Sequence, residues 1–257
     1  MRRLSSWCLV PALALAAACG KAADKPADAP AADTAAMAAP AGPQAIVTVI
    51  YNQPKDTAAF EKYYAETHLP LVTASQQEIG FTKAELTRFT STLDGRKAPF
   101  YRQAELYFDS VEDAKKGTAT PGFKKVGDDL ANFATGGLLG MMAVETGDKG
   151  SAGCPALVTV IYDTPKDSAA FESYYSATHL PLVGGGQQEI GFVRADLTRF
   201  TQNLDGSAPA KYRQAELCFN SMDELRKGVA TPAFKKVGDD LGNFATGGLT
   251  ALIGEQQ

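Results

Sequence analysis

The sequence predicts an α+β protein in which one unit of strands and helices occurs twice. Three observations predict it: a long internal repeat, short β-branched segments that alternate with helical periodicity, and a strand with one apolar and one polar face. The chain has 257 residues, of which 45% are hydrophobic and 21% are charged, as in globular proteins. Its formal net charge is -4 and it lacks runs of like charge, so we expect no nucleic-acid partner.

The repeat begins at Ala45 and again at Ala156, an offset of 111 residues (156 minus 45). It continues without a gap to Leu138 and Leu249, and roughly two thirds of the paired positions are identical. Two copies of this length suit two similar domains, or two halves of one pseudo-symmetric domain. We therefore assign residues 45–147 to the first repeat, 148–155 to a linker and 156–254 to the second repeat.

The first half of each copy predicts a strand followed by a helix. Residues 46–51 (IVTVIY) are short and β-branched, which is typical of a buried strand. Asp56 is a candidate N-cap for the helix, and Pro70 is expected to end it. One face of this helix carries apolar, aromatic and imidazole side chains at helical spacing, namely Phe60, Tyr64, Thr67, His68 and Leu71.

The second half of each copy predicts a hairpin, two helical stretches and a last strand. Residues 79–90 and 100–109 are expected to be strands around the turn Leu93-Asp94-Gly95. Ser110 is a candidate cap for a helix over residues 111–116, and Pro121 opens a helical stretch to residue 133. Residues 138–144 complete the order β-α-β-β-α-β, which predicts a ferredoxin-like antiparallel sheet covered by helices on one face.

The third strand indicates what covers the other face. Ala104, Leu106 and Phe108 should face the helices, and the remaining positions should face away from them, namely Tyr101, Gln103, Glu105 and Tyr107. Such a face is too aromatic to stay bare, so we expect the sheet of the other copy to pack on it around a ligand cavity. We expect the first and third strands of a copy to run parallel, which would place Cys154 and Cys218 at opposite ends of the sheet, so we expect both thiols to be free.

The amino terminus has the features of a targeting segment. Two arginines precede an apolar run of signal-peptide length, and Leu15-Ala16-Ala17-Ala18-Cys19 resembles a bacterial lipobox. Residues 1–18 are then a signal peptide, Cys19 is the lipidation site, and Gly20 indicates forwarding to the outer membrane. The alternative is an ordinary signal cut that leaves a free cysteine. Residues 19–44, which are mostly Ala, Pro and Asp after Cys19, predict a tether.

The repeats resemble the EthD family of the dimeric α/β-barrel superfamily. The resemblance rests on Tyr51, Pro54, Phe60-Glu61, Tyr64, Thr67-His68-Leu69-Pro70-Leu71, and Phe133 followed by Gly136, and on the same pattern in the second copy. It implies two ferredoxin-like repeats that close a pseudo-dimeric α/β barrel within a monomer. It also implies an oxidoreductase of reductase type that acts on a small, partly apolar molecule, and the amino-terminal segment, in which this chain departs from the family, makes it a cell-envelope lipoprotein. The alternative is a non-catalytic module that binds a small molecule.

The histidines are the candidate catalytic residues, because an imidazole titrates in the range useful for acid-base catalysis. His68 and His179 lie on the aromatic face of their helices, and either one could instead cap carbonyls or bond a neighbour. The candidate substrate-binding residues are Tyr51, Tyr64, Arg88 and Glu105, with Tyr162, Tyr175, Arg199 and Glu216 in the second repeat. For the arginines, an ion pair between sheets is the structural alternative.

Other residues offer weaker signals. Asp128-Asp129 and Asp239-Asp240 lie beside glycines and are expected to cap or solvate a helix rather than bind a metal. We expect no metal site, and the sequence has no dinucleotide fingerprint, so it leaves any cofactor unknown.

Overall fold

The computed structural model describes residues 44–147 and 153–257. These residues belong to one compact unit that spans Ala39–Gln257. The predicted signal peptide, the lipidation site Cys19, the tether up to residue 43 and residues 148–152 of the linker lie outside the described residues. In the part of the chain that the structure describes, no helix is long and apolar enough to cross a membrane.

Each repeat has the predicted β-α-β-β-α-β order. The elements of the first repeat are β1 (Ala45–Asn52), α1 (Thr57–Tyr63), a π-helical turn (Tyr64–His68), α2 (Leu69–Ile79), β2 (Lys83–Thr92), β3 (Phe100–Phe108), α3 (Val111–Thr118), α4 (Pro121–Asp129), a 3-10 turn (Leu130–Asn132) and β4 (Leu138–Glu145). Those of the second are β5 (Ala156–Tyr162), α5 (Ser168–Tyr174), a π-helical turn (Tyr175–His179), α6 (Leu180–Ile190), β6 (Arg194–Asn203), β7 (Arg213–Phe219), α7 (Met222–Val229), α8 (Pro232–Asp240), a 3-10 turn (Leu241–Asn243) and β8 (Leu249–Gln256).

Local sequence signals explain where the helices begin. The Asp56 carboxylate accepts a hydrogen bond from the Ala59 N–H, and the Ser110 hydroxyl caps α3 in the same way. Pro70 does not end the first helix, as the sequence had suggested. It lies in the first turn of α2, where a missing N–H is tolerated, and the helix continues to Ile79. Gly80 then ends α2 in the left-handed region at φ 82°.

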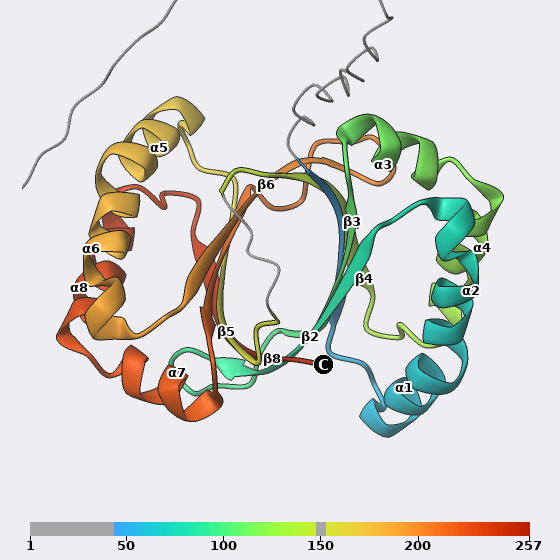
Figure 1. Ribbon diagram of the computed structural model, residues 1–257, viewed down its shortest axis with the longest axis horizontal. Helices are drawn as coiled ribbons and strands as arrows, with labels where there is room; N and C mark the ends of the chain where they lie inside the picture. Colours follow the sequence, from blue (N-terminus) through green and yellow to red (C-terminus); the bar gives the residue numbers. More distant parts are fainter. Residues whose placement is uncertain (1–43, 148–152) are drawn as a thin grey trace, which may run out of the picture. The chain divides into compact units, whose positions relative to one another are not determined.

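The eight strands form one closed barrel in the order β1-β3-β2-β8-β5-β7-β6-β4. Within each repeat the four strands pair antiparallel, as the ferredoxin-like order predicts. The repeats join where β2 pairs with β8 and where β4 pairs with β6. Figure 1 shows α1 to α4 outside one half of the barrel and α5 to α8 outside the other. The pseudo-dimeric barrel is therefore closed within one chain.

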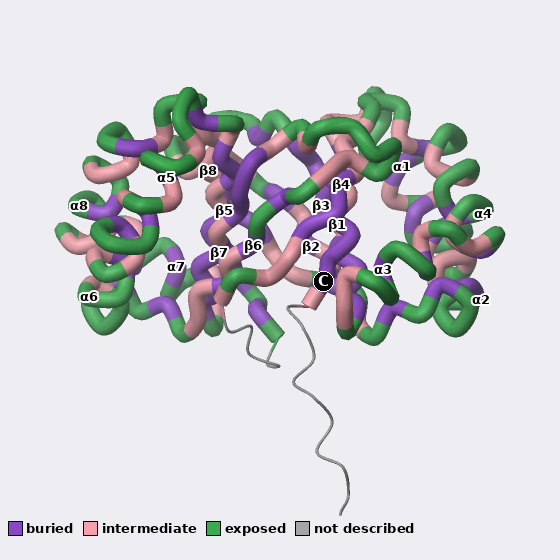
Figure 2. The backbone as a smooth tube through the Cα atoms, turned by 90° about the horizontal axis from the view of Figure 1, so that it is seen from above, coloured by how far each residue is buried: buried purple, intermediate pink, exposed green. Residues whose placement is uncertain are grey.

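The barrel interior is a packed core. Large side chains from both repeats meet there, among them Ile50, Tyr107, Met141, Ile161 and Phe200. Figure 2 shows buried residues along the strands and exposed residues on the outer surfaces of the helices. The predicted facing of the third strand is wrong at Tyr101, because the β1–β3 register shifts near this residue. Its ring contacts Phe60 of α1 on the helix side, with ring centroids 5.2 Å apart.

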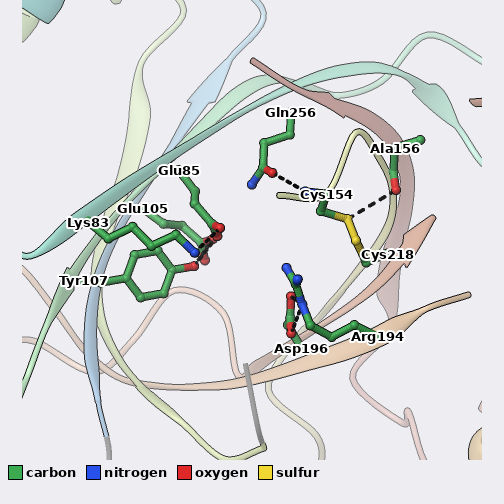
Figure 3. Close-up of polar contacts among 10 residues, drawn as sticks. All are labelled: Lys83, Glu85, Glu105, Tyr107, Cys154, Ala156, Arg194, Asp196, Cys218 and Gln256. Atoms are coloured by element: carbon green, nitrogen blue, oxygen red, sulfur yellow. Dashed lines mark hydrogen bonds and ion pairs between the residues drawn. A yellow bond between two sulfur atoms is a disulfide. The ribbon is translucent and has the colours of Figure 1, made fainter. Parts of the chain in front are cut away.

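Cys154 and Cys218 form a disulfide, with Cα atoms 5.4 Å apart, so the expectation of two free thiols is wrong. β5 and β7 are antiparallel, and Leu157 lies opposite Cys218. The residues just before β5 therefore lie beside the end of β7, and not at the opposite end of the sheet. Figure 3 shows the disulfide on the inner side of the barrel, where Cys218 takes the position equivalent to Tyr107 of the first repeat.

Candidate functional site

The cavity of the first repeat lies between the helices and the outer face of the barrel. Its volume is about 470 Å³, and its walls come from β1, β2, β3, α2, α4 and the π-helical turn. The residues that line it are mostly aliphatic, including Val47, Val49, Leu86, Leu106 and Val126. The sequence had placed the ligand cavity between the two sheets. The cavities that contain the histidines instead lie in the helix–sheet layer, since interior side chains fill the barrel.

His68 lies at the inner wall of this cavity and is 3% exposed. It ends the π-helical turn, in which the Leu69 N–H donates to the Tyr64 carbonyl instead of to an oxygen four residues back. The imidazole packs against Phe133, at 4.7 Å between ring centroids, and against Tyr64, at 5.4 Å. The turn therefore places Tyr64 and His68 side by side on the cavity wall.

Asp129 holds the imidazole in place. His68 Nδ1 lies 2.8 Å from Asp129 Oδ2. The other carboxylate oxygen, Oδ1, accepts hydrogen bonds from the Tyr63 hydroxyl at 2.8 Å and the Asn132 amide at 3.0 Å. The sequence assigned Asp129 to capping or solvating a helix, but it is the last residue of α4 and bonds a histidine 61 positions away. The sequence did contain one signal for this contact, because His179 and Asp240 in the second copy are separated by the same 61 positions.

The electrostatics favour a neutral His68 with a free lone pair. Burial lowers the pKa of His68 below its usual range, although the neighbouring Asp129 acts to raise it. Burial acts to raise the pKa of Asp129, but its hydrogen bonds with His68 and Tyr63 outweigh this effect and lower it. A carboxylate can only accept, so Nδ1 carries the imidazole proton. No hydrogen bond among residues 44–147 and 153–257 engages Nε2, which is available to a ligand.

Two tyrosines complete the polar part of the wall. Tyr51 and Tyr64 both line the cavity, and their rings are 5.9 Å apart, edge to face. Burial raises the pKa of Tyr64 to about 12 and the pKa of Tyr51 further, so both hydroxyls stay protonated at neutral pH. They can therefore donate hydrogen bonds to an oxygen atom of a ligand.

An ion pair between the buried Arg102 and the partly exposed Glu61 lies beside Tyr64. The Arg102 guanidinium lies 4.7 Å from the centre of the Tyr64 ring and binds Glu61 at 2.8 Å. The Tyr101 hydroxyl also donates to Glu61, at 2.5 Å. Arg102 is 3% exposed, so this cluster fixes the Tyr64 ring from the side of β3.

The predicted arginine sites lie outside the two cavities. Arg88 binds Glu255 of β8 at 2.7 Å, which is the ion pair between sheets that was the structural alternative. Arg199 lies 5.3 Å from the centre of the Tyr212 ring. Neither arginine lines the cavity of its own repeat.

The predicted glutamate sites face the barrel interior. Glu105 accepts hydrogen bonds from Tyr107 at 2.9 Å and from Gln214 of the other repeat at 3.3 Å. Glu216 in turn accepts a hydrogen bond from the Gln103 amide of the first repeat, also at 3.3 Å. Both carboxylates thus connect the repeats across the interior and lie apart from the histidines (Figure 3 shows Glu105).

The second repeat contains the same histidine–aspartate pair, which we call the dyad, beside a much smaller cavity. His179 Nδ1 lies 2.8 Å from Asp240 Oδ2, and burial lowers the pKa of His179. Tyr162 and Tyr175 line this cavity with His179, as the repeat predicts, but its volume is only about 70 Å³. The structure therefore brings Tyr51, Tyr64 and His68 together around an open space, and their counterparts around a nearly filled one.

The described residues do not indicate a metal centre. Within them, no group of three or more His, Cys, Asp or Glu side chains is placed to hold a metal ion. The polar groups of the first cavity are instead suited to proton transfer and hydrogen bonding.

Comparisons with known proteins agree with this architecture. A curated relative from Rhodococcus erythropolis, described as an uncharacterized 11.0 kDa protein in the thcB-thcC intergenic region, is 37% identical over 100 residues, covering 39% of this chain and 93% of the relative. A crystal structure of an ethyl tert-butyl ether d (EthD) family protein from Bacillus halodurans is 29% identical, covers 42% of this chain and 99% of that chain, and gives a TM-score of 0.35.

A whole-barrel likeness comes from the crystal structure of an anthrone oxidase-like protein. It is 14% identical, has a TM-score of 0.57, and covers 84% of this chain and 92% of that chain, which supports the fold alone. A model of the EthD domain matches this chain twice, over residues 52–137 and 163–248. Because these two matches cover more than half of the sequence, the chain belongs to the EthD family and carries two EthD domains in tandem.

Proposed function

We propose that this protein is an enzyme that acts on a small, largely apolar molecule in the cavity of the first repeat, with His68 as general base. One observation carries the proposal. A buried, neutral imidazole lines a cavity of about 470 Å³ with its Nε2 engaged by no hydrogen bond among the described residues, while Asp129 holds its Nδ1 at 2.8 Å. This arrangement fixes the tautomer and supports the imidazolium that forms when the base takes a proton.

The first step is a proton transfer. Nε2 of His68 takes a proton from an acidic C–H or O–H group of the ligand, and the electron pair of that bond stays on the ligand as an enolate or phenolate. A hydroxyl of Tyr51 or Tyr64 then donates a hydrogen bond to the anionic oxygen, and Asp129 pairs with the imidazolium. Each charge that forms therefore has a partner: a tyrosine hydroxyl on the cavity wall for the anion, and Asp129 behind His68 for the imidazolium.

The oxidoreductase assignment extends this step. An enolate or phenolate gives up electrons more readily than its neutral acid, so proton abstraction prepares an apolar substrate for oxidation. EthD membership supports a role of oxidoreductase type. A shared fold does not fix a reaction, so the proton transfer is the part to test first.

Proton exchange provides that test. Enolisable aryl ketones are incubated with the protein in D₂O, and the loss of the α-proton signal is followed by NMR. Wild type should accelerate the exchange, and His68→Gln should lose about 10²- to 10⁴-fold of the acceleration, the usual contribution of a general base. His179→Gln is the matched control and should keep it. Binding without exchange in wild type would contradict the enzymatic role and favour the binding module.

We also propose that the protein is an envelope lipoprotein anchored through Cys19. The signal-like start and the lipobox support this address, and so does the disulfide between Cys154 and Cys218, because such bonds persist in oxidising compartments. Wild type should partition into the detergent phase and Cys19→Ala into the aqueous phase. Aqueous partitioning of both proteins would contradict the lipid anchor.

A further inference from the structure

The cavities of the two repeats are built from equivalent residues but differ greatly in volume. The first holds about 470 Å³, which lies in the range of ligand pockets, and the second about 70 Å³, room for roughly two water molecules. Most lining positions carry the same residue in both copies, including the tyrosines and the histidine. The difference must come from the few positions that do not match.

One position that does not match, Gly140 in the first repeat and Ala251 in the second, lies where the repeats meet, beside a leucine that both copies share. Each cavity is bordered by the leucine at the hairpin tip of the other repeat: Leu204 borders the first cavity, and Leu93 borders the second. Their backbones are anchored alike, because the Leu204 N–H donates to Gly140 and the Leu93 N–H donates to Ala251, both at 2.9 Å. The hairpins therefore occupy equivalent places on β4 and β8.

The two leucine side chains differ in their surroundings. Leu93 packs against the core beneath the helices of the second repeat, which contains Val158, Val183 and Leu217. Leu204 is 37% exposed, and among the described residues it joins none of the core clusters. Leu93 thus fills its cavity, whereas Leu204 leaves its cavity open.

The residue beneath this leucine differs between the copies. A Cβ atom at Gly140 would lie 2.7 Å from Leu204 Cδ1, which is closer than such atoms approach, so the Leu204 side chain would have to shift. In the second repeat the equivalent residue is Ala251, which already carries this Cβ, and both Ala251 and Leu93 line the cavity.

We propose that the chain has one open ligand site, in the first repeat, and that the Gly140–Leu204 pair across the repeat junction keeps it open. The inference rests on the proposed function for the identity of the site. It also indicates the ligand class. The charged side chain on the lining, Lys83, is paired with Glu85 at 2.5 Å, and His68 is neutral. The site therefore suits an uncharged, mostly apolar molecule of one or two rings.

The test counts binding sites with 2-naphthol, a neutral two-ring probe. Calorimetric titration uses the full chain carrying Cys19→Ala, so that no lipid competes for the probe. The protein with no change other than Cys19→Ala should bind one equivalent of the probe. Gly140→Ala should weaken binding at least ten-fold, because Leu204 must swing over the cavity. Leu204→Ala in that background should restore binding, and Ala251→Gly should add a second equivalent.

Gly185→Ala is the matched control, because a Cβ there meets no atom within 4 Å, and it should bind as wild type does. Two equivalents for wild type, no binding, or an unchanged affinity in Gly140→Ala would each overturn the inference. A chain that binds one equivalent but catalyses no proton exchange would contradict the proposed function and leave this inference standing.

Discussion

His68 shows how one side chain acquires a role from its neighbours. Burial keeps the imidazole neutral, Asp129 fixes which nitrogen carries the proton, and the π-helical turn directs the ring to the cavity wall. The sequence singled out His68 and its aromatic neighbours by helical spacing. It missed Asp129, because a partner 61 residues away is visible only once α4 packs beside the π-helical turn.

Removing the Asp129 carboxylate should damage both stability and acid-base behaviour. Asp129→Asn loses the charge that acts to raise the pKa of His68, so that pKa should fall further. It also weakens two hydrogen bonds in a buried network, at a cost of about 1–3 kcal/mol in the free energy of unfolding. Urea denaturation and histidine NMR titration measure the two effects.

The control for this change is Asp128→Asn. Asp128 pairs with Lys124 on the exposed face of α4, at 2.5 Å, and its loss should cost less than about 1 kcal/mol. Equal effects of Asp128→Asn and Asp129→Asn would show that the dyad is not a special element of the site.

The buried histidines should also make stability depend on pH. Because burial lowers the pKa of His68 and His179, the unfolded chain binds more protons than the folded chain below pH of about 6.5. Their contribution to stability is complete above that pH and declines as the pH falls through it. The free energy of unfolding of wild type should therefore drop between pH 7 and 5 more steeply than that of His68→Gln/His179→Gln. A steeper drop in the double variant would contradict the neutral assignment.

At the scale of the secondary-structure elements, the sequence predicted features that depend on neighbouring residues, and it did not predict features that depend on distant ones. The caps Asp56 and Ser110 were predictable, because each carries its hydrogen-bond partner within three residues. Pro70 misled, because a proline ends a helix only when it lies in the interior, and here it opens α2 after a π-helical turn. Cys154 misled because the third strand was expected to run parallel to the first, whereas the hairpin between β6 and β7 reverses the chain and makes β5 and β7 antiparallel.

The disulfide should be a substantial stabiliser of the second repeat. It connects residues 64 positions apart, so it restricts the unfolded chain, and its loss should cost about 2–4 kcal/mol. A reductant should lower the melting temperature of wild type and leave that of Cys154→Ser/Cys218→Ser unchanged. No effect of reductant on wild type, after mass spectrometry confirms reduction, would contradict this role.

At the scale of the whole molecule, closure of the barrel makes the repeats interdependent. β2 and β4 pair with β8 and β6, and the interior core draws on both copies. Residues 45–147 expressed alone would expose two sheet edges and an apolar face, so they should dimerise or aggregate. Light scattering of residues 45–257, which contain both repeats, should give the mass of a monomer. A stable monomeric half would contradict the closed barrel.

The resemblance of the repeats to the EthD family anticipated this closure, and the strand pairing confirms it. The difference between the two sites was not predictable from the repeat. Roughly two thirds of the paired positions are identical, and we propose that the unequal cavities depend on one methyl group, which Ala251 has and Gly140 lacks. Such a contact between hairpin and strand exists only after the barrel closes.

Nitrogen NMR of the imidazoles tests the account most directly, because the chain has only two histidines. At pH 7 both rings should be neutral and protonated at Nδ1, each with a pKa below about 6.5, as their burial beside Asp129 and Asp240 requires. On addition of 2-naphthol, the Nε2 signal of His68 alone should move. Protonation at Nε2, a pKa above 6.5, or equal shifts of both histidines would contradict the proposed base and its single open site.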